Sequence, residues 1–387
     1  MSKKELEKIY FKALERVKAS SIIKPNVSIK DNTLFIGKDK YKISKASNIY
    51  IYGVGKAALD MAKECEKIVG NRISGGLIIS NEVGSLKYLK HKTSTHPIVS
   101  KKSIKAGELL LKSVEKMKEE DIFIFLLSGG ASALIEKPIE GLSLKDFKKI
   151  SSSLLTSGID IKALNTVRKS ISQIKGGKLA SKIKAKGSVL VLSDVIGDDL
   201  NTIGSAPMNN KKFNHQIVGN NSIALNEAKK YIEKRVEKTK IVTSTLDLNS
   251  KDASLFISEE IKKHDKKYDS FCLLFGGETT TVVKGKGYGG RNQELALRLL
   301  LQNSANKNIS FLCAGSDGID GRSDATGAFV DYKIYKMIKD KKLNPKEYLK
   351  NSDSNTFFRA LNYDFTIGKT GTNVMDFIIV LKEKGSK

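Results

Sequence analysis

Residues 122–133, IFIFLLSGGASA, join six apolar residues to a loop of serine, glycine and alanine. An unbroken apolar run is typical of a strand buried on both faces, as in the middle of a parallel sheet. We therefore predict a central strand over Ile122–Leu127. Gly129 and Gly130 after it would let backbone amides approach a phosphate closely, and the neighbouring serines can donate to its oxygens. The alternative is a tight strand-to-helix turn, which explains the same residues without a ligand.

Working outward from this stretch, strand patterns alternate with helix patterns, which predicts an α/β fold with largely parallel sheets. The predicted strands cover residues 48–53, 76–80, 122–127, 188–192, 240–244, 270–275, 311–314 and 377–381. Five of them end in loops rich in Gly, Ser or Asp, near residues 53, 128, 193, 276 and 315. We expect these ends to share one sheet edge, because the strands are predicted to be parallel. In open α/β sheets ligands bind at the carboxyl ends of the strands.

The loop after the first of these strands reads Gly53-Val54-Gly55-Lys56 and leads into a predicted helix. A strand, a glycine turn and a helix start form a natural anion site, since unpaired N–H groups point at the ligand. Lys56 is placed where a lysine would face that anion. The alternative is an ordinary lysine in the first helical turn, where its charge opposes the helix dipole.

Two predicted strand ends carry acidic loops. Residues 311–328, FLCAGSDGIDGRSDATGA, contain Asp317, Asp320 and an arginine, Arg322, and the loop at 193–199 contains Asp194. Carboxylates at such a spacing can hold a hydrated divalent metal beside an anion. An Asp-rich turn without a ligand is the alternative for either loop taken alone.

Three further segments add polar groups or turns. A helical pattern over 143–180 places Asn165, Arg168 and Ser172 near one face, where they line a cleft or face water. The β-branched residues 279–283 predict a hairpin partner, and the glycine-rich residues 284–290 predict a flexible loop before Arg291.

Composition limits the class of protein. The 387 residues suffice for two domains, and no apolar run is long enough for a membrane span. The three cysteines form no CxxC pair and predict a cytoplasmic protein without a structural zinc site. The net charge of +26 rests mainly on dispersed lysines, with only eight arginines, which favours a solvated surface over nucleic-acid binding.

The chemistry-bearing groups that remain are glycine loops, lysine, arginine and carboxylates. They match phosphoryl transfer, which depends on positioning and charge neutralisation. No Ser-His-Asp set, nucleophilic cysteine context or GxGxxG fingerprint is present.

Several long blocks resemble one known family. SDVIGDDLNTIGSAP, GGETTTVVKGKGYGGRNQELAL and AGSDGIDGRSDATGA are similar to signature blocks of the glycerate 2-kinase family, whose C-terminal half is the MOFRL domain. GVGKAA, SGGASAL and LNTVRKSISQIKGGKLA resemble its N-terminal blocks in the same order. One departure is Ala206, which stands where the family commonly has glycine.

The resemblance implies ATP-dependent phosphorylation of D-glycerate at its 2-hydroxyl, with Mg²⁺ or another divalent cation. It implies a Rossmann-like domain over 1–245 and a smaller mixed α/β domain over 246–387, with the active site in the cleft between them. A hydroxypyruvate reductase-type oxidoreductase is the alternative function. The expected partner is a small molecule, not nucleic acid or a membrane, and the oligomeric state stays open, with a homodimer as one alternative.

The residue roles expected from the loops and the resemblance fall into four groups. The catalytic residues are Lys56, Arg322 and Asp194, and the metal ligands are Asp194, Asp317 and Asp320. The substrate-binding residues are Lys56, Arg322, Arg291, Asn165 and Arg168. The nucleotide-binding residues are Ser128, Gly129, Gly130, Ala131, Ser132, Gly276, Gly277 and Glu278.

Overall fold

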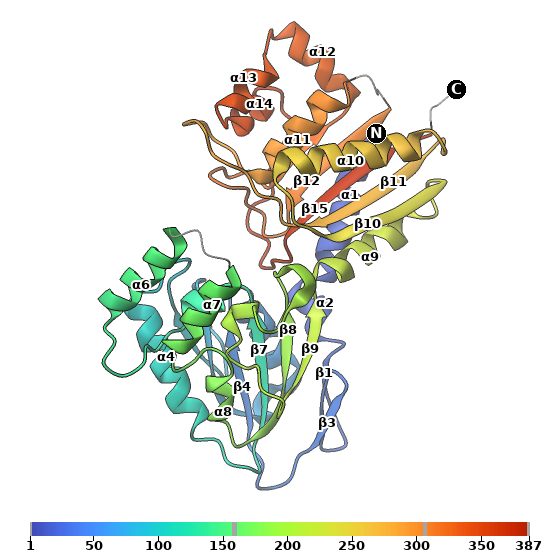
Figure 1. The fold of residues 1–387 in the computed structure, drawn as a ribbon. Helices are drawn as coiled ribbons and strands as arrows, with labels where there is room; N and C mark the ends of the chain where they lie inside the picture. Colours follow the sequence, from blue (N-terminus) through green and yellow to red (C-terminus); the bar gives the residue numbers. More distant parts are fainter. Residues whose placement is uncertain (1, 157–160, 305–307, 385–387) are drawn as a thin grey trace. The chain divides into compact units, whose positions relative to one another are not determined.

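The computed structural model describes residues 2–156, 161–304 and 308–384, and it divides the chain into two compact units. One unit is Ala19–Gly219, and the other joins Met1–Lys18 to Asn220–Lys387. We call them the 19–219 unit and the 220–387 unit, the latter including the N-terminal helix. Figure 1 colours both by sequence.

The 19–219 unit is built on a parallel sheet of six strands in the order β6-β5-β4-β7-β8-β9. Its strands are β4 (Ile49–Val54), β5 (Ile73–Ser80), β6 (Lys90–Thr93), β7 (Ile122–Ser128), β8 (Lys186–Leu192) and β9 (Asn214–Gly219). A separate antiparallel sheet consists of β1 (Val27–Lys30), β2 (Thr33–Ile36) and β3 (Asp39–Lys42). The helices are α2 (Ala19–Ile23), α3 (Ala58–Val69), α4 (Lys101–Val114), α5 (Ala131–Leu134), α6 (Leu144–Thr156), α7 (Ile161–Ser170) and α8 (Lys178–Ser181), with short 3₁₀ turns η1 (Gly70–Arg72), η2 (Ile196–Asp198) and η3 (Ile203–Ser205).

The central strand predicted from IFIFLL is confirmed, because β7 lies between β4 and β8 and all seven of its residues are buried. Phe123, Phe125 and Leu127 on one face pack into a cluster that includes residues of α4 and α8. Burying both faces of this strand explains why its sequence shows no alternation of polar and apolar residues.

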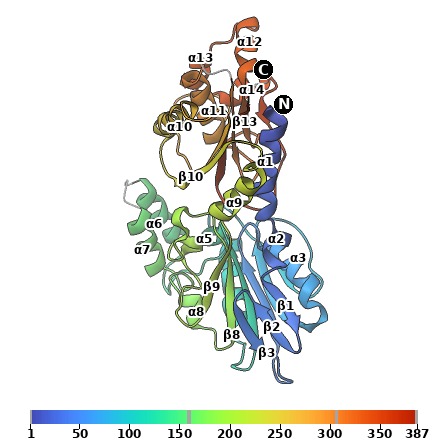
Figure 2. The ribbon, with the colours of Figure 1, turned by 90° about the vertical axis from the view of Figure 1, so that its right-hand side faces the viewer.

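The 220–387 unit contains a second, mixed sheet of six strands in the order β10-β11-β15-β12-β13-β14. Its strands are β10 (Lys238–Leu246), β11 (Phe271–Gly277), β12 (Ile309–Gly315), β13 (Gly327–Val330), β14 (Asp364–Phe365) and β15 (Asp376–Lys382). Its helices are α1 (Ser2–Arg16), α9 (Asn221–Ile232), α10 (Ser250–Asp265), α11 (Arg291–Gln302), α12 (Tyr332–Asp340), α13 (Pro345–Lys350) and α14 (Ser354–Ala360). The pairs α1–α9 and α10–α11 cover opposite faces of this sheet (Figure 2).

The N-terminal helix α1 is amphipathic, as its apolar spacing predicts. Leu6, Ile9, Ala13 and Leu14 are all buried, and the helix packs against β12 and β15. The Tyr10 hydroxyl donates to the Gly315 carbonyl at 2.7 Å. In the compact units, α1, α9 and β10 pack with the second sheet, and the domain division at residue 245 stays a prediction.

The prediction that five strand ends share one edge is wrong. β4, β7 and β8 end at one edge of the first sheet, whereas β11 and β12 belong to the second sheet. β15 runs antiparallel to both β11 and β12, so the ends of those two strands lie beside the start of β15 at Asp376. Two edges, each in its own unit, carry the polar loops.

Three local predictions also differ from the structure. The helical pattern over 143–180 is divided among α6, α7 and α8, with residues 157–160 outside the described part of the chain. Thr279–Val283 forms no strand; Thr280 makes only an isolated bridge with Asn249. The loop at 284–290 is held by hydrogen bonds rather than free, as described below. Among the described residues, no helix has both the length and the apolarity needed to cross a bilayer.

Candidate active site

The turn after β4 closes against the loop after β7 in the 19–219 unit. The Lys56 amide donates to the Gly129 carbonyl at 2.9 Å, and the Ala57 amide donates to Ser128 Oγ at 3.1 Å. Gly55 has φ +141°, and a Cβ there would lie 2.0 Å from Ser128 Oγ. Only glycine permits this approach, which places the two predicted loops side by side.

Asp194 and His96 complete this cluster, which we call the Lys56 cluster (Lys56, His96, Ser128–Gly130 and Asp194). A Cβ on Gly129 would lie 1.7 Å from Asp194 Oδ2, so the carboxylate rests directly on this glycine. A Cβ on Gly130 would lie 2.9 Å from His96 Cδ2 and 3.2 Å from Lys56 Cγ, so both side chains flank the loop. The structure thus brings together three groups from the ends of β4, β7 and β8.

His96 is the member of the Lys56 cluster that sequence reasoning missed, because it lies in no motif. Burial and then the nearby charge of Lys56 lower its pKa, which favours the neutral imidazole. A neutral histidine can accept or donate a hydrogen bond beside an anion without adding a second positive charge. Its proximity to the loop arises from the chain between β6 and α4, which a local pattern does not indicate.

The remaining predicted residues of this unit are more scattered. Ala131 is buried and Ser132 is half-buried, both on the short helix α5. Asn165 and Arg168 are half-buried on α7. Ser172 is not on that helical face, because α7 ends at Ser170 and Ser172 is fully buried.

A buried ion pair lies behind the loop after β7. Lys175 Nζ pairs with Glu136, and the two side chains are 1% and 0% exposed. Ser172 Oγ donates to the same carboxylate, and the Lys175 ammonium faces the Phe147 ring at 5.5 Å. Burial lowers the pKa of Lys175 despite Glu136, and the charge of Arg168 lowers it further. The pair fastens the chain after α5 to the turn before α8.

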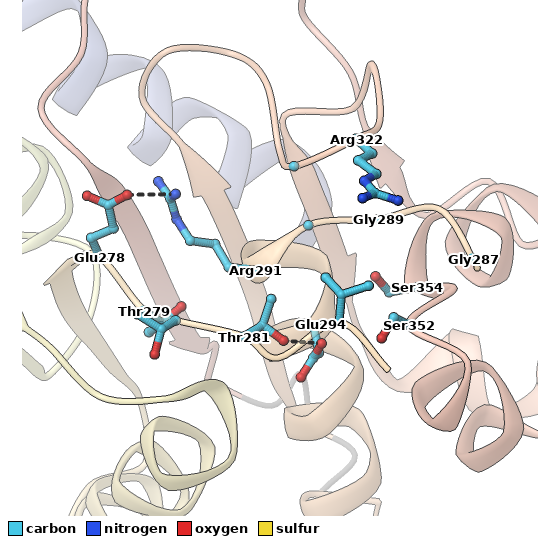
Figure 3. Close-up of a pocket in the computed structure, with 14 residues that line it drawn as sticks. Glu278, Thr279, Thr281, Gly287, Gly289, Arg291, Glu294, Arg322, Ser352 and Ser354 are labelled. Atoms are coloured by element: carbon cyan, nitrogen blue, oxygen red, sulfur yellow. Dashed lines mark hydrogen bonds and ion pairs between the residues drawn. The ribbon is translucent and has the colours of Figure 1, made fainter. Parts of the chain in front are cut away.

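The 220–387 unit contains a pocket of about 370 Å³ beside the predicted glycine loop (Figure 3). Residues of four segments line it: Glu278, Thr279, Thr280, Thr281 and Val283; Gly287, Gly289, Gly290, Arg291 and Glu294; Gly321 and Arg322; Ser352 and Ser354. We call it the Arg291 pocket. It contains two of the predicted substrate-binding arginines, and the exposed Arg322 side chain has no ion-pair partner among the described residues.

The glycine loop that lines the Arg291 pocket is hydrogen-bonded along its length. Gly287 N donates to Asn351 O at 3.1 Å, and Tyr288 N donates to Asp353 Oδ1 at 2.8 Å. Arg322 N donates to Gly289 O at 3.1 Å, which ties the acidic loop to the glycine loop. These contacts do not favour the flexible loop that the sequence predicts at 284–290. The glycines of this loop are needed for close packing.

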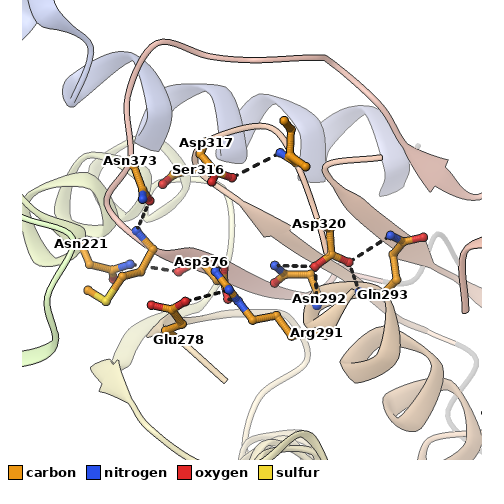
Figure 4. A network of polar contacts seen from close by, with 12 residues as sticks. Asn221, Glu278, Arg291, Asn292, Gln293, Ser316, Asp317, Asp320, Asn373 and Asp376 are labelled. Carbon is orange, nitrogen blue, oxygen red and sulfur yellow. Dashed lines mark hydrogen bonds and ion pairs between the residues drawn. The ribbon is translucent and has the colours of Figure 1, made fainter. Parts of the chain in front are cut away.

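Arg291 begins α11 and is held between two carboxylates (Figure 4). Its Nε and Nη2 contact the Asp376 oxygens at 2.6 and 3.0 Å, and its Nη1 contacts Glu278 Oε1 at 2.7 Å. Burial lowers the pKa of the guanidinium but the two carboxylates outweigh it, so the pKa of Arg291 is raised and the group is always charged. Gly276 and Gly277, which precede Glu278, are buried at the end of β11.

Asp320 caps the N-terminus of α11, and both of its carboxylate oxygens accept hydrogen bonds there. It accepts from the Asn292 and Gln293 amides at 3.0 and 2.9 Å, and from the Gln293 side chain at 3.0 Å. Burial raises its pKa to about 6, although these donors oppose the rise. Asp317 is only half-buried, and its Oδ1 accepts from the Ile319 amide at 3.2 Å.

The carboxylates of the acidic loops differ in how well they fit the divalent cation that the resemblance implies. Within the described ranges, no group of three or more His, Cys, Asp or Glu side chains is arranged to hold a metal ion. Mg²⁺ in phosphoryl-transfer sites takes one or two carboxylates, with substrate phosphates and water as the other ligands. Asp194 and Asp317 are partly exposed and fit that requirement, whereas Asp320 would first have to release α11.

Comparisons with known proteins identify families and relatives that match most of the chain. The family described as "Domain of unknown function (DUF4147)" matches residues 5–238, and the MOFRL family matches residues 271–376. The D-glycerate 2-kinase of Thermotoga maritima is 34% identical over 95% of this chain and 97% of its own. The glycerate 2-kinase of Pyrococcus horikoshii is 33% identical over 92% and 91%.

Solved structures show the same fold. The crystal structure of a Thermotoga maritima glycerate kinase has a TM-score of 0.88 and 33% identity, over 98% of this chain and 99% of that one. A Pyrococcus horikoshii protein has a TM-score of 0.86 and 29% identity, over 99% of both chains. The signature blocks, the two α/β units and these relatives together show that the chain belongs to the glycerate 2-kinase family.

Proposed function

We propose that this protein transfers the γ-phosphoryl group of ATP to the 2-hydroxyl of D-glycerate, giving 2-phosphoglycerate and ADP with a divalent cation. The observation that carries the proposal is the Lys56 cluster, in which a lysine and a carboxylate flank a glycine loop at the carboxyl edge of a parallel sheet. Relatives named as glycerate 2-kinases that cover nearly the whole chain support it.

In this proposal Lys56 neutralises negative charge on the transferring phosphoryl group or on the glycerate carboxylate. Phosphoryl transfer leaves little covalent chemistry to the protein. A lysine ammonium held beside the reacting oxygens can therefore contribute much of the transition-state stabilisation. The backbone amides of the Ser128–Ala131 loop would lie along phosphate oxygens. Ser132, Gly276, Gly277 and Glu278 stay predictions for the nucleotide.

Asp194 is proposed to orient the attacking 2-hydroxyl and accept its proton, or to hold the cation. A divalent cation held by Asp194 would supply positive charge that offsets the charge of the phosphate groups. Asp194 fits either role because its carboxylate rests on Gly129 of the loop. Asp317 is the second residue proposed for the cation, while Asp320 stays a prediction that its capping role does not favour.

The Arg291 pocket is proposed to bind an anionic group through Arg291 and Arg322. Arg322 is exposed at the rim of the pocket, and its backbone is fixed by the glycine loop. A guanidinium can bind a carboxylate or phosphate edge with two parallel hydrogen bonds. Asn165 and Arg168, and a location of the whole site in an interdomain cleft, stay predictions.

The test measures ADP release from ATP and D-glycerate, in parallel with NADH consumption on hydroxypyruvate. We expect ADP release that needs both glycerate and a divalent cation, and no NADH consumption. Lys56→Met should lower kcat by about 10²-fold or more, while Lys63→Met, at an exposed position of α3, should not. NADH oxidation without ADP release would replace the kinase by the reductase.

A further inference from the structure

The two carboxylates that hold Arg291 differ in how firmly they are placed. The Asp376 side chain is 1% exposed and meets the guanidinium through Nε and Nη2, whereas Glu278 is 44% exposed and contacts Nη1. A two-atom contact with a buried carboxylate is geometrically specific. An ion pair with a half-exposed carboxylate is weak, because water screens it.

The backbone around Asp376 is fixed independently of Arg291. Asn221 Nδ2 donates to the Asp376 and Val374 carbonyls, both at 2.9 Å. Met375 adopts φ +70°, a conformation that a residue with a Cβ keeps only where its surroundings impose it. As the first residue of β15, Asp376 also pairs with Gly277 and Gly315 on the two neighbouring strands. Asp376 is therefore a rigid support.

A second observation points to a ligand in the Arg291 pocket. Thr279, which follows Glu278 and lines the pocket, is only 2% exposed. Its Oγ1 is buried and has no hydrogen-bond partner among the described residues. A buried hydroxyl without a partner is costly, so a polar group arriving in the pocket would satisfy it.

We infer that Asp376 is a positioning residue that aims Arg291 at the pocket, and that Glu278 is an internal counter-ion that an incoming oxyanion replaces. The oxyanion is a carboxylate or phosphoryl edge; that it belongs to glycerate or nucleotide rests on the proposed function. On binding, the oxyanion replaces Glu278 as the partner of Arg291 Nη1 and accepts a hydrogen bond from Thr279 Oγ1. Arg291 keeps its charge throughout and stays anchored to Asp376.

An anion must therefore compete with the Glu278 carboxylate for Arg291, which weakens anion binding in the pocket. A ligand that cannot replace Glu278 does not bind to Arg291, since the charge of Arg291 is already offset by the two carboxylates. Removing the Glu278 charge should tighten anion binding, whereas removing the Asp376 charge should loosen it. A role in folding alone predicts no such opposite pair of effects.

The first experiment uses inorganic phosphate as the probe and needs no turnover. Its dissociation constant is measured by calorimetry for the wild type, Glu278→Gln, Asp376→Asn and Glu259→Gln. Glu259 is an exposed residue of α10, so its variant controls for the same change in net charge. We expect about three- to five-fold tighter binding for Glu278→Gln, about ten-fold weaker binding for Asp376→Asn, and wild-type binding for Glu259→Gln.

The second experiment repeats the measurement with D-glycerate and with ADP, which separates a carboxylate from a phosphate ligand. The ligand whose affinity follows the same opposite pattern is the one that occupies Arg291. Circular dichroism establishes that each variant is folded. Arg291→Lys keeps the charge but loses the two-atom contact with Asp376. It supports the positioning role if it weakens anion binding as much as Asp376→Asn does.

Equal affinities in Glu278→Gln and the wild type, or tightening matched by Glu259→Gln, would overturn the exchange. An Asp376→Asn protein that is folded and binds phosphate normally would overturn the positioning role. Because the phosphate measurement needs no kinase activity, failure of the proposed function would appear separately, as absent ADP release from a protein that still shows the opposite pattern.

Discussion

The buried pair Lys175–Glu136 allows one prediction to be worked through in detail. Neither side chain is exposed to solvent beyond 1%, and the pair joins the segment after the 128–130 loop to the turn before α8. In Lys175→Met the apolar stem is kept and the ammonium is lost. Glu136 is then a buried carboxylate without its counter-ion.

Breaking a buried ion pair by removing one partner typically costs about 3–5 kcal/mol, because the remaining charge is uncompensated. Glu136 would keep Ser172 Oγ and the Lys137 amide, the latter at 3.0 Å. These two donors place the expected cost of Lys175→Met near the lower limit, at about 3 kcal/mol. The double variant Lys175→Met, Glu136→Gln removes both charges and should cost only about 1 kcal/mol.

The measurement is urea unfolding followed by far-UV circular dichroism, since the chain contains no tryptophan for fluorescence. Two units can unfold in separate transitions, so the stability of the one that responds is compared among variants. Lys182 and Glu115 form an exposed pair at 3.7 Å, with side chains 53% and 46% exposed. Lys182→Met is therefore the matched control and should change stability by less than about 0.5 kcal/mol.

Two results would refute this reasoning. One is a loss of less than about 1 kcal/mol in Lys175→Met, which would mean that water or protonation relieves Glu136 at little cost. The other is a double variant whose loss equals the sum of the losses in Lys175→Met and in Glu136→Gln measured alone, because additivity would show that the two charges do not depend on each other.

Three further predictions concern single residues. Burial raises the pKa of Asp320 from 3.8 to about 6, so as the pH rises the unfolded chain loses this proton before the folded one does. The Asp320 contribution to stability should therefore fall by about 3 kcal/mol between pH 3 and 7; the unfolding free energy of the wild type minus that of Asp320→Asn, from urea titrations, should show this fall, and a difference that does not change with pH would contradict it. Ala206 adopts φ +58°, so Ala206→Gly should raise the unfolding free energy by about 1 kcal/mol, and a destabilised variant would argue against strain there. Gly129→Ala, whose Cβ would meet Asp194, should lower kcat at least about ten-fold with little change in thermal midpoint; normal turnover would separate Asp194 from the chemistry.

The local patterns predicted the elements of the fold better than their assembly. The apolar run at β7 and the apolar spacing of α1 identify a central strand and an amphipathic helix, because burial imposes each pattern on neighbouring residues. The position of β15 between β11 and β12 depends on partners far away in the sequence. The separation of β11 and β12 from the sheet of β4, β7 and β8 depends on such distant partners too, so the sequence predicts one sheet edge where the structure has two.

In the candidate site, too, local patterns were easier to predict than contacts between distant segments. Lys56 and the 128–130 loop could be found because strand, glycine turn and helix start follow one another along the chain. His96 and the support of Arg291 by Asp376 could not, since each joins residues from separate elements. Asp320 was predicted to hold metal because it stands in an acidic loop, but its side chain serves the N-terminus of α11, 27 and 28 positions away along the chain.

The most direct test of the central claim is the position of the phosphate on the product made from ATP and D-glycerate. Proton-coupled ³¹P NMR distinguishes the two monophosphates, because a phosphate on the 2-oxygen couples to one carbon-bound proton and one on the 3-oxygen couples to two. We predict a doublet that grows together with ADP and is absent with Lys56→Met. A triplet, or no new phosphorus resonance while the wild type is folded and saturated with both substrates, would contradict phosphorylation at the 2-hydroxyl.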